Sequence, residues 1–183
     1  MIIGITGTIG AGKGTIVDYL VKRRGFAHFS ARALIVEEIE KRGLPVSRDS
    51  MVAVANDMRR KHSPSWVAEQ LFARAQALEG PAIIESLRTV GEVHKLQEQE
   101  NFLLLAVDAD QKTRFARVQQ RKDAQSDDVT FVQFAAQEAR EMKNVDPTKQ
   151  NLAGCIALAD HVLRNDGTIE DLHEQVEGVL RGR

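Results

Sequence analysis

The chain has 183 residues, of which 43% are hydrophobic, and its 25 basic and 26 acidic side chains leave a formal net charge of −1. This length predicts one domain, residues 1–183, and the charge balance excludes a general basic field that would make nucleic acid an obligatory partner. The sequence contains no apolar run long enough to cross a bilayer, opens directly into an apolar segment and has one cysteine, Cys155, expected to be a buried filler and not a nucleophile. We therefore expect a cytoplasmic protein with no membrane partner, either a monomer or a small homo-oligomer.

The first predicted strand, Ile2 to Thr6, runs into a glycine-rich loop that is followed by a segment with helical spacing. Glycines let the backbone curl so that successive N–H groups converge on phosphate oxygens, and the next helix adds its positive N-terminus. The G-x-x-x-x-G-K spacing places Lys13 to reach the β and γ phosphates of a nucleotide. The alternative is a turn that binds nothing. The predicted phosphate-binding residues are Gly7, Thr8, Ile9, Gly10, Ala11, Gly12, Lys13, Gly14 and Thr15.

A metal site is predicted beside this loop. Gly14 occupies the position at which the general pattern has Ser or Thr, and the hydroxyl follows one residue later at Thr15. We expect Thr15 to approach Mg²⁺ directly or through water. Glu85, at the predicted carboxyl end of the third strand, would hold the waters of the same metal or orient an acceptor. The alternative for Glu85 is a solvated loop position.

Short apolar segments alternate with longer segments of helical spacing, which predicts an α/β fold with a mainly parallel sheet. Four more strands are predicted at 26–29, 82–85, 102–107 and 161–164. Helix ends are predicted at Gly25, Gly43 and Gly80, and helix starts at Ser63, Thr89 and Thr130, the last two as capping boxes with Glu92 and Gln133.

Two helical insertions, 31–79 and 113–159, are longer than one crossover between parallel strands requires. Insertions that rise from the carboxyl ends of the strands flank whatever the glycine-rich loop holds. We expect the first to bind an acceptor and the second to form a lid over about 113–145. Alternatively, the extra helices only thicken a layer.

Arginines on the second insertion are candidates for contact with a migrating phosphoryl group. Arg114, Arg117 and Arg121 are spaced by three and four residues and so share one helical face. Arg117 and Arg121 are favoured because the lid should lie farther along the chain. An exposed basic stripe is the alternative.

An anionic acceptor needs at least one arginine, because bidentate contacts fix the orientation of a phosphate. Ser30 and Arg32 follow the second strand, Arg59 lies in the first insertion and Arg88 follows the third strand. These four are the predicted acceptor-binding residues. The alternative for the cluster that contains Arg59, residues 59–62, is a set of cations that stabilise a helix C-terminus.

The chain resembles the nucleoside monophosphate kinase group of P-loop phosphotransferases, in which the loop often ends in Gly-Lys-Gly-Thr. Residues 1–15 and 159–168 are similar to the opening and the closing strand of dephospho-CoA kinases, while 83–88 and 106–114 resemble archaeal adenylate-kinase-related proteins. The sequence His28-Phe29-Ser30-Ala31-Arg32 replaces the Asp-x-Asp usual in the former and the Thr-Gly-Asp of adenylate kinases.

The resemblance implies a three-layer fold with five parallel strands, and it implies ATP and Mg²⁺ as cofactors. It adds Arg140 as a second lid arginine, unless Arg140 pairs with Glu138 or Glu141, and it adds Asn165 and Gly167 as contacts to the donor base. The expected activity is transfer of the γ-phosphate of ATP to a nucleoside or deoxynucleoside monophosphate. The alternatives are a kinase of a CoA precursor or another metabolite, and a slowly hydrolysing switch that binds a partner protein.

Overall fold

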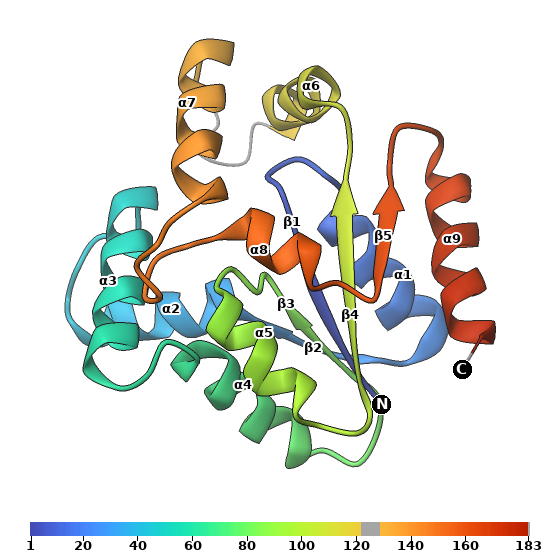
Figure 1. Cartoon of the computed structure of the whole chain (residues 1–183), viewed down its shortest axis with the longest axis horizontal. Coiled ribbons are helices and arrows are strands. Elements are labelled where there is room, and N and C mark those ends of the chain that lie inside the picture. The colour runs from blue at the N-terminus through green and yellow to red at the C-terminus, as the bar shows by residue number, and fades with distance from the viewer. Residues whose placement is uncertain (122–128, 183) are drawn as a thin grey trace.

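The computed structural model describes residues 1–121 and 129–182. Within these ranges the centre of the protein is a five-stranded parallel sheet with the strand order β2-β3-β1-β4-β5 (Figure 1). Each predicted strand is confirmed within one residue of its expected bounds. The strands are β1 (Ile2–Gly7), β2 (Ala27–Ser30), β3 (Ala82–Glu85), β4 (Phe102–Asp108) and β5 (His161–Arg164).

The central strand β1 pairs with β3 on one side and with β4 on the other, so that Ile3 lies opposite Ile83 and Leu103. Successive side chains of a strand point to opposite faces, and both faces of this sheet are covered. Ile83 accordingly packs into one core cluster while its neighbour Ile84 packs into the other. The continuous apolar runs in the sequence reflect this two-sided burial.

Helices pack on both faces of the sheet (Figure 1). On the first face, α1 and α9 bury side chains such as Leu20 and Val176, and on the second, α4, α5 and α8 bury Leu71, Leu96 and Cys155. These helices are α1 (Lys13–Arg24), α9 (Ile169–Arg181), α4 (Trp66–Gln76), α5 (Val90–Gln97) and α8 (Leu152–Ala157).

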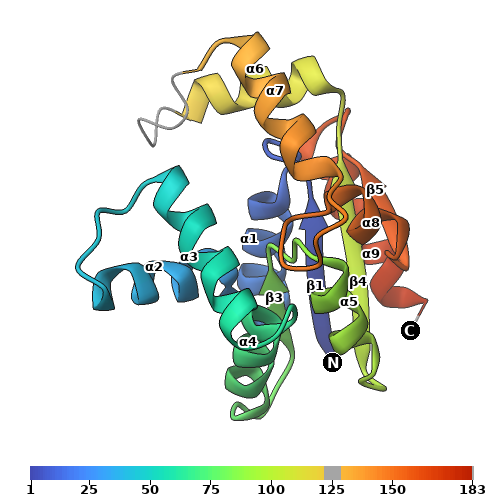
Figure 2. The same ribbon diagram turned by 60° about the vertical axis from the view of Figure 1, so that its left-hand side comes forward.

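The remaining helices belong to the two long connections. Helices α2 (Ala31–Lys41) and α3 (Arg48–Lys61) precede α4 between β2 and β3, and α6 (Gln111–Arg121) and α7 (Phe131–Met142) follow β4. Figure 2 shows α6 and α7 beyond the carboxyl ends of the strands, with α2 and α3 to one side. Both groups of helices therefore border the end of the sheet at which β1 stops.

Local signals fixed most helix boundaries. Gly25 ends α1 in the left-handed conformation, and the capping boxes at Thr89 and Thr130 are confirmed. The predicted start at Ser63 is wrong, because α4 begins at Trp66 with Ser65 as its N-cap. The Ser63 hydroxyl instead donates a hydrogen bond of 3.0 Å to Glu69. Gly43 directly follows the end of α2 with a φ of 66°, whereas Gly80 lies beyond the C-cap of α4.

Candidate functional site

The phosphate loop, residues 7–15, joins the carboxyl end of β1 to α1. Its φ angles are 79° at Gly10 and 109° at Gly12, which residues with a side chain rarely adopt. Packing excludes a side chain as well, because a Cβ at Gly10 would lie 2.5 Å from the carbonyl oxygen of Arg114, and one at Gly12 would lie 2.1 Å from Nδ2 of Asn165. The loop therefore requires glycine at both positions.

The start of α1 concentrates positive charge at this loop. Gly12 is the N-cap and gives no side-chain hydrogen bond, and the first turn contains no acidic residue. No side chain caps this end of the helix, so its macrodipole adds positive potential at the loop, where it favours an anion. The ammonium of Lys13 donates hydrogen bonds of 2.9 Å to the carbonyl of Gly7 and 2.8 Å to that of Thr8, which keeps its charge at the loop.

A cavity of about 1050 Å³ borders the phosphate loop from Gly10 to Thr15. Glu85 from β3 and Arg117 from α6 line the same cavity, as do Ile169 and His173 from α9. Among the described residues, its lining includes four cations against two carboxylates. The cations are Lys13, Lys22, Arg23 and Arg117, and the carboxylates are Asp18 and Glu85. The excess of positive charge suits a polyanionic ligand.

Glu85 is held at the end of β3 by two neighbours. The hydroxyl of Ser86 donates a hydrogen bond of 2.9 Å to its Oε1, and Nε2 of His28 lies 3.5 Å from its Oε2. Burial raises the pKa of Glu85, but hydrogen bonding from His28 and Ser86 and the charge of Lys13 outweigh burial, so its pKa lies below the usual value. Glu85 is therefore a carboxylate at neutral pH, as a ligand of metal-bound water must be.

Ser86 has a φ of 72° and is the one positive-φ residue other than glycine in the described part of the chain. Such a conformation costs about 1–3 kcal/mol and persists where the surroundings impose it. Here the Ser86 amide donates to the carbonyl of Ile5 at 2.9 Å, and the hydroxyl of Thr6 donates to the carbonyl of Leu87 at 2.8 Å. Bonds from β1 thus fix the turn that presents Glu85 to the cavity.

The three arginines of α6 have different surroundings. Arg114 is 4% exposed and pairs with Glu138, so it is not part of an exposed basic stripe. Arg117 lines the cavity, and its Nη1 is a buried atom without a hydrogen-bond partner within the described chain. Arg121 is the last residue of α6, and its side chain lies outside the described residues. Arg117 is thus the α6 arginine that lines the cavity, whereas Arg114 is enclosed beside the phosphate loop.

Arg140 on α7 is exposed, and its Nε donates a hydrogen bond of 3.3 Å to the carbonyl of Ala136 in its own helix. The two carboxylates that the sequence offers as its partners pair elsewhere, Glu138 with Arg114 and Glu141 with Arg88. The structure therefore does not bring Arg140 to the phosphate loop.

The four predicted acceptor residues are not gathered in one place. Ser30 caps α2 by accepting a hydrogen bond of 3.4 Å from the amide of Ala33, and Arg32 is exposed on the first turn of α2. Arg88 is half-buried and donates bonds of 3.2 Å to Glu141 and 2.8 Å to Gln150. Both arginines border the carboxyl ends of the strands, where an acceptor would approach.

Arg59 corrects a prediction. Its side chain is 3% exposed and donates two hydrogen bonds, of 2.9 and 2.7 Å, to Oε1 of Glu92, which is fully buried. A guanidinium enclosed in this way has no surface for an acceptor. The helix-end interpretation agrees with the structure, because Arg59, Arg60 and Lys61 all lie in the last turn of α3, the latter two exposed.

The turn after β5 also differs from expectation. Asn165 is buried and donates a hydrogen bond of 2.8 Å to the carbonyl of Ala11, so it supports the phosphate loop and does not face a base. Gly167 is exposed and lies against Asp171. Ile169 and His173, which were not predicted from the sequence, line the cavity instead. The spacing of four residues between Ile169 and His173 puts them on one face of α9, and it was the signal available in the sequence.

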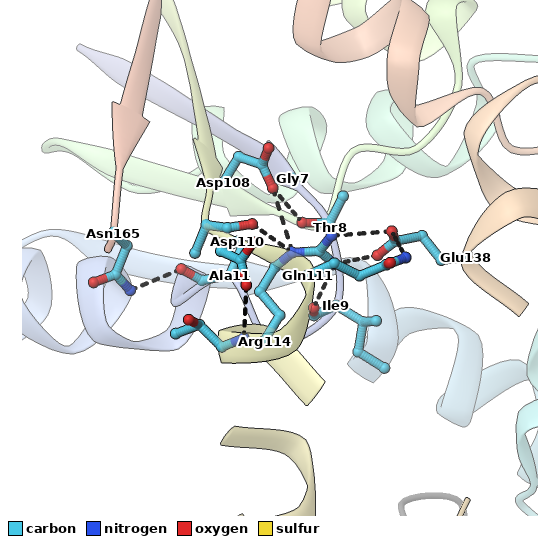
Figure 3. Close-up of polar contacts among 12 residues, drawn as sticks. Gly7, Thr8, Ile9, Ala11, Asp108, Asp110, Gln111, Arg114, Glu138 and Asn165 are labelled. Atoms are coloured by element: carbon cyan, nitrogen blue, oxygen red, sulfur yellow. Dashed lines mark hydrogen bonds and ion pairs between the residues drawn. The ribbon is translucent and has the colours of Figure 1, made fainter. Parts of the chain in front are cut away.

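A polar network beneath the phosphate loop was also not predicted (Figure 3). The hydroxyl of Thr8 donates a hydrogen bond of 2.9 Å to Oδ1 of Asp108 at the end of β4, and Nε of Arg114 lies 3.5 Å from the same oxygen. Arg114 also pairs with Glu138 on α7. The network connects the loop to β4, α6 and α7.

The described residues contain neither a ready-made metal cluster nor a membrane-spanning helix. Groups of three or more His, Cys, Asp and Glu side chains able to hold a metal do not occur in residues 1–121 and 129–182. Over the same residues, every helix is too short or too polar to cross a membrane. A metal at Thr15 and Glu85 would therefore depend on phosphate oxygens and water for its other ligands, which is how Mg²⁺ usually binds.

The strand order, the glycine-rich loop after β1 and the helix that begins at Lys13 define a P-loop protein with a kinase-like α/β fold. The chain belongs to a family described as "AAA domain", whose model matches residues 3–146. This finding confirms the resemblance to P-loop nucleoside monophosphate kinase-like proteins that the sequence indicated.

Relatives and solved structures agree with this assignment. The chain is 29% identical to a UPF0200 protein of Thermococcus gammatolerans, with 100% of this chain and 97% of the relative covered. It is 28% identical to a UPF0200 protein of Pyrococcus horikoshii, with 98% and 96% covered. These names specify no acceptor.

Among solved structures, protein TT1252 of Thermus thermophilus superposes with a TM-score of 0.66 at 22% identity, with 100% of this chain and 97% of that protein covered. Shikimate kinase of Bacteroides thetaiotaomicron superposes with a TM-score of 0.58 at 14% identity, with 99% and 98% covered. At these identities the likeness shows the fold alone.

Proposed function

We propose that the protein is a phosphotransferase that moves the γ-phosphate of ATP to a small phosphorylated, nucleotide-like acceptor, a nucleoside or deoxynucleoside monophosphate. The observation that carries this proposal is the shared cavity of Lys13, Thr15, Glu85 and Arg117 beside a loop that has no room for a side chain at Gly10 or Gly12. A switch has no need of Arg117, a cation from a second insertion whose buried Nη1 lacks a partner within the described chain.

The residues of the cavity fit ATP and Mg²⁺. The N–H groups at the start of α1 and the ammonium of Lys13 would hold the phosphates, and Thr15 and Glu85 would hold the metal or its waters. When bound, ATP supplies the phosphoryl group and Mg²⁺ offsets the charge between its phosphates. Ile169 and His173 would bound the donor base, since they line the same cavity from α9.

Phosphoryl transfer passes through a loose transition state, so the protein contributes position and positive charge. Lys13 and Arg117 would stabilise the charge on the transferred group, and Glu85 would orient the acceptor or a metal-bound water. Arg32 and Arg88 remain the candidates for the acceptor phosphate, with residues 31–79 as the acceptor insertion and 113–145 as the lid. Arg140 would reach the site only with movement of that lid, and Arg121 remains a candidate lid arginine.

A coupled ADP-release assay over nucleoside monophosphates, deoxynucleoside monophosphates and dephospho-CoA tests this proposal. We expect one of the monophosphates to raise the rate at least about 10-fold above the rate with ATP alone, because a positioned acceptor outcompetes water. Stimulation by dephospho-CoA alone would assign the CoA-precursor alternative. A slow rate that no acceptor changes would favour the switch.

A further inference from the structure

Arg114 is a buried cation with several polar partners, and the proposed chemistry does not use it. The residue is 4% exposed, lies in the second turn of α6 and has contacts to three separate segments. Its Nε donates a hydrogen bond of 2.9 Å to the carbonyl of Ala109, directly after β4. The other two contacts reach the phosphate loop and α7 (Figure 3).

The contact with the phosphate loop involves both the side chain and the backbone of Arg114. Its Nη1 donates a hydrogen bond of 3.3 Å to the carbonyl of Ile9. Its own carbonyl oxygen lies so close to Gly10 that a Cβ there would be 2.5 Å away. Helix α6 therefore rests directly on the loop at Ile9 and Gly10.

The contact with α7 is a buried ion pair. Both terminal nitrogens of Arg114 donate to the carboxylate of Glu138, Nη2 to Oε1 at 3.0 Å and Nη1 to Oε2. Gln111, one turn earlier on α6, donates a bond of 2.9 Å to the same carboxylate, and the guanidinium lies over the ring of Phe134 with 5.9 Å to its centroid. Asp108, with its Oδ1 3.5 Å from Nε of Arg114, is the other carboxylate that faces the guanidinium.

Holding two helices together does not require charge. Apolar side chains of similar volume often replace a buried ion pair without loss of stability, because they avoid the cost of desolvating two charges. They would leave the carbonyls of Ile9 and Ala109 without a donor, however. The planar guanidinium has enough N–H groups in a fixed arrangement to serve both carbonyls and Glu138 together.

We propose that the Arg114–Glu138 ion pair is a positioning device that fixes α6 and α7 to the phosphate loop and so sets the place of Arg117 in the cavity. Arg117 follows Arg114 by three residues, which puts both on one side of α6. Fixing Arg114 to Ile9 and Glu138 therefore fixes the helical turn that carries Arg117. The proposal depends on the proposed function in one respect, because it assumes that Arg117 has a role in turnover.

A double-mutant cycle tests the proposal. Glu138→Gln keeps the shape of the side chain and removes the charge that holds Arg114, and we expect it to lower kcat about 10-fold in the natural sequence. In an Arg117→Ala background the same change should lower kcat less than about 2-fold, because the residue that the pair positions is already missing. Equal losses in both backgrounds, or no loss in either, would overturn the proposal.

The test includes one control variant and one substitute variant. Glu98→Gln removes a carboxylate from an exposed ion pair with Lys95 and should leave kcat unchanged. If Glu138→Gln does not fold, Arg114→Lys takes its place in the cycle, since lysine keeps the charge and loses the fork of donors. The losses of kcat in the natural sequence and in the Arg117→Ala background are then compared in the same way.

The proposed function can fail separately. If no acceptor stimulates turnover, the double-mutant cycle is measured with the rate of ATP hydrolysis in place of the rate of transfer. If hydrolysis is also absent, hydrogen exchange of residues 8–12 gives the answer. We expect faster exchange of that segment in Glu138→Gln than in Glu98→Gln, whereas equal exchange would overturn the positioning role.

Discussion

The side-chain amide of Asn165 donates a hydrogen bond of 2.8 Å to the carbonyl of Ala11, which lies 154 residues earlier in the chain. Asn165 is 6% exposed, so the turn after β5 supports the phosphate loop from the interior of the protein. Together with Arg114 at Ile9 and Asp108 at Thr8, this bond means that three separate segments hold the loop in its curled shape.

The substitution Gly12→Ala tests how closely Asn165 packs against the phosphate loop. We expect a loss of at least about 2 kcal/mol in the free energy of unfolding, because the new Cβ would meet Nδ2 of Asn165 at a φ of 109°. Gly178→Ala, on an exposed position of α9 with open space around it, should instead stabilise by about 0.5–1 kcal/mol. Urea unfolding of both variants measures the difference, and a Gly12→Ala variant as stable as the natural protein would contradict it.

Lys13→Ala should lower turnover at least about 10²-fold with the fold retained, because preorganised charge usually contributes more to transition-state stabilisation than any other single effect. The measurement is the ADP-release rate with the best acceptor, alongside matched circular dichroism. Lys95→Ala is the control, because Lys95 lies on α5 in an exposed pair with Glu98 and should keep full activity. An unchanged rate in Lys13→Ala would refute the assignment of the phosphate site.

Arg59→Leu should lower the free energy of unfolding by about 3–5 kcal/mol, because it leaves the fully buried carboxylate of Glu92 without its charge partner. Glu92 also accepts hydrogen bonds of 2.8 Å from the Arg88 amide and 3.1 Å from the Thr89 amide, so the loss should extend to the start of α5. Arg74→Leu breaks an exposed pair with Glu37 and should cost less than about 1 kcal/mol. Similar urea midpoints for the two variants would show that the buried pair contributes no more than the exposed one.

The thiol of Cys155 should resist alkylation in the native protein. Burial raises its pKa to about 12, so at pH 8 only about one molecule in 10⁴ carries the reactive thiolate. Because the folded pKa is above the unfolded one, burial of the thiol stabilises the fold below about pH 9, and this contribution is lost as the pH rises towards 12. A colorimetric thiol titration with and without urea measures the reactivity, and rapid labelling without urea would contradict the burial.

Most of the fold was predictable from local signals. The continuous apolar strands are buried on both faces of the sheet, so their position needed no knowledge of the rest of the chain. The capping boxes at Thr89 and Thr130 are likewise local, because both partners of each box lie within four residues. Ser63 failed as a cap because its hydroxyl bonds to Glu69, a partner that a cap pattern does not consider.

The side-chain partners within the site were not predictable in the same way. Arg59, Arg88 and Arg114 look alike in the sequence, yet they pair with Glu92, Glu141 and Glu138 on other helices. Which arginine remains at the cavity depends on how those helices pack, and helical spacing alone does not give packing. Arg117 follows Arg114 by three residues on α6, but the pairing of Arg114 with Glu138 depends on the position of α7.

The left-handed backbone conformation of Ser86 predicts which residue different kinds of selection would retain at this position. Glycine at position 86 would relieve the left-handed conformation, and it would also remove the hydroxyl that holds Glu85. A library at this position screened for heat resistance should therefore converge on glycine, whereas one screened for turnover should retain serine. Under the proposed role of Glu85, folding and chemistry make opposing demands on this single residue.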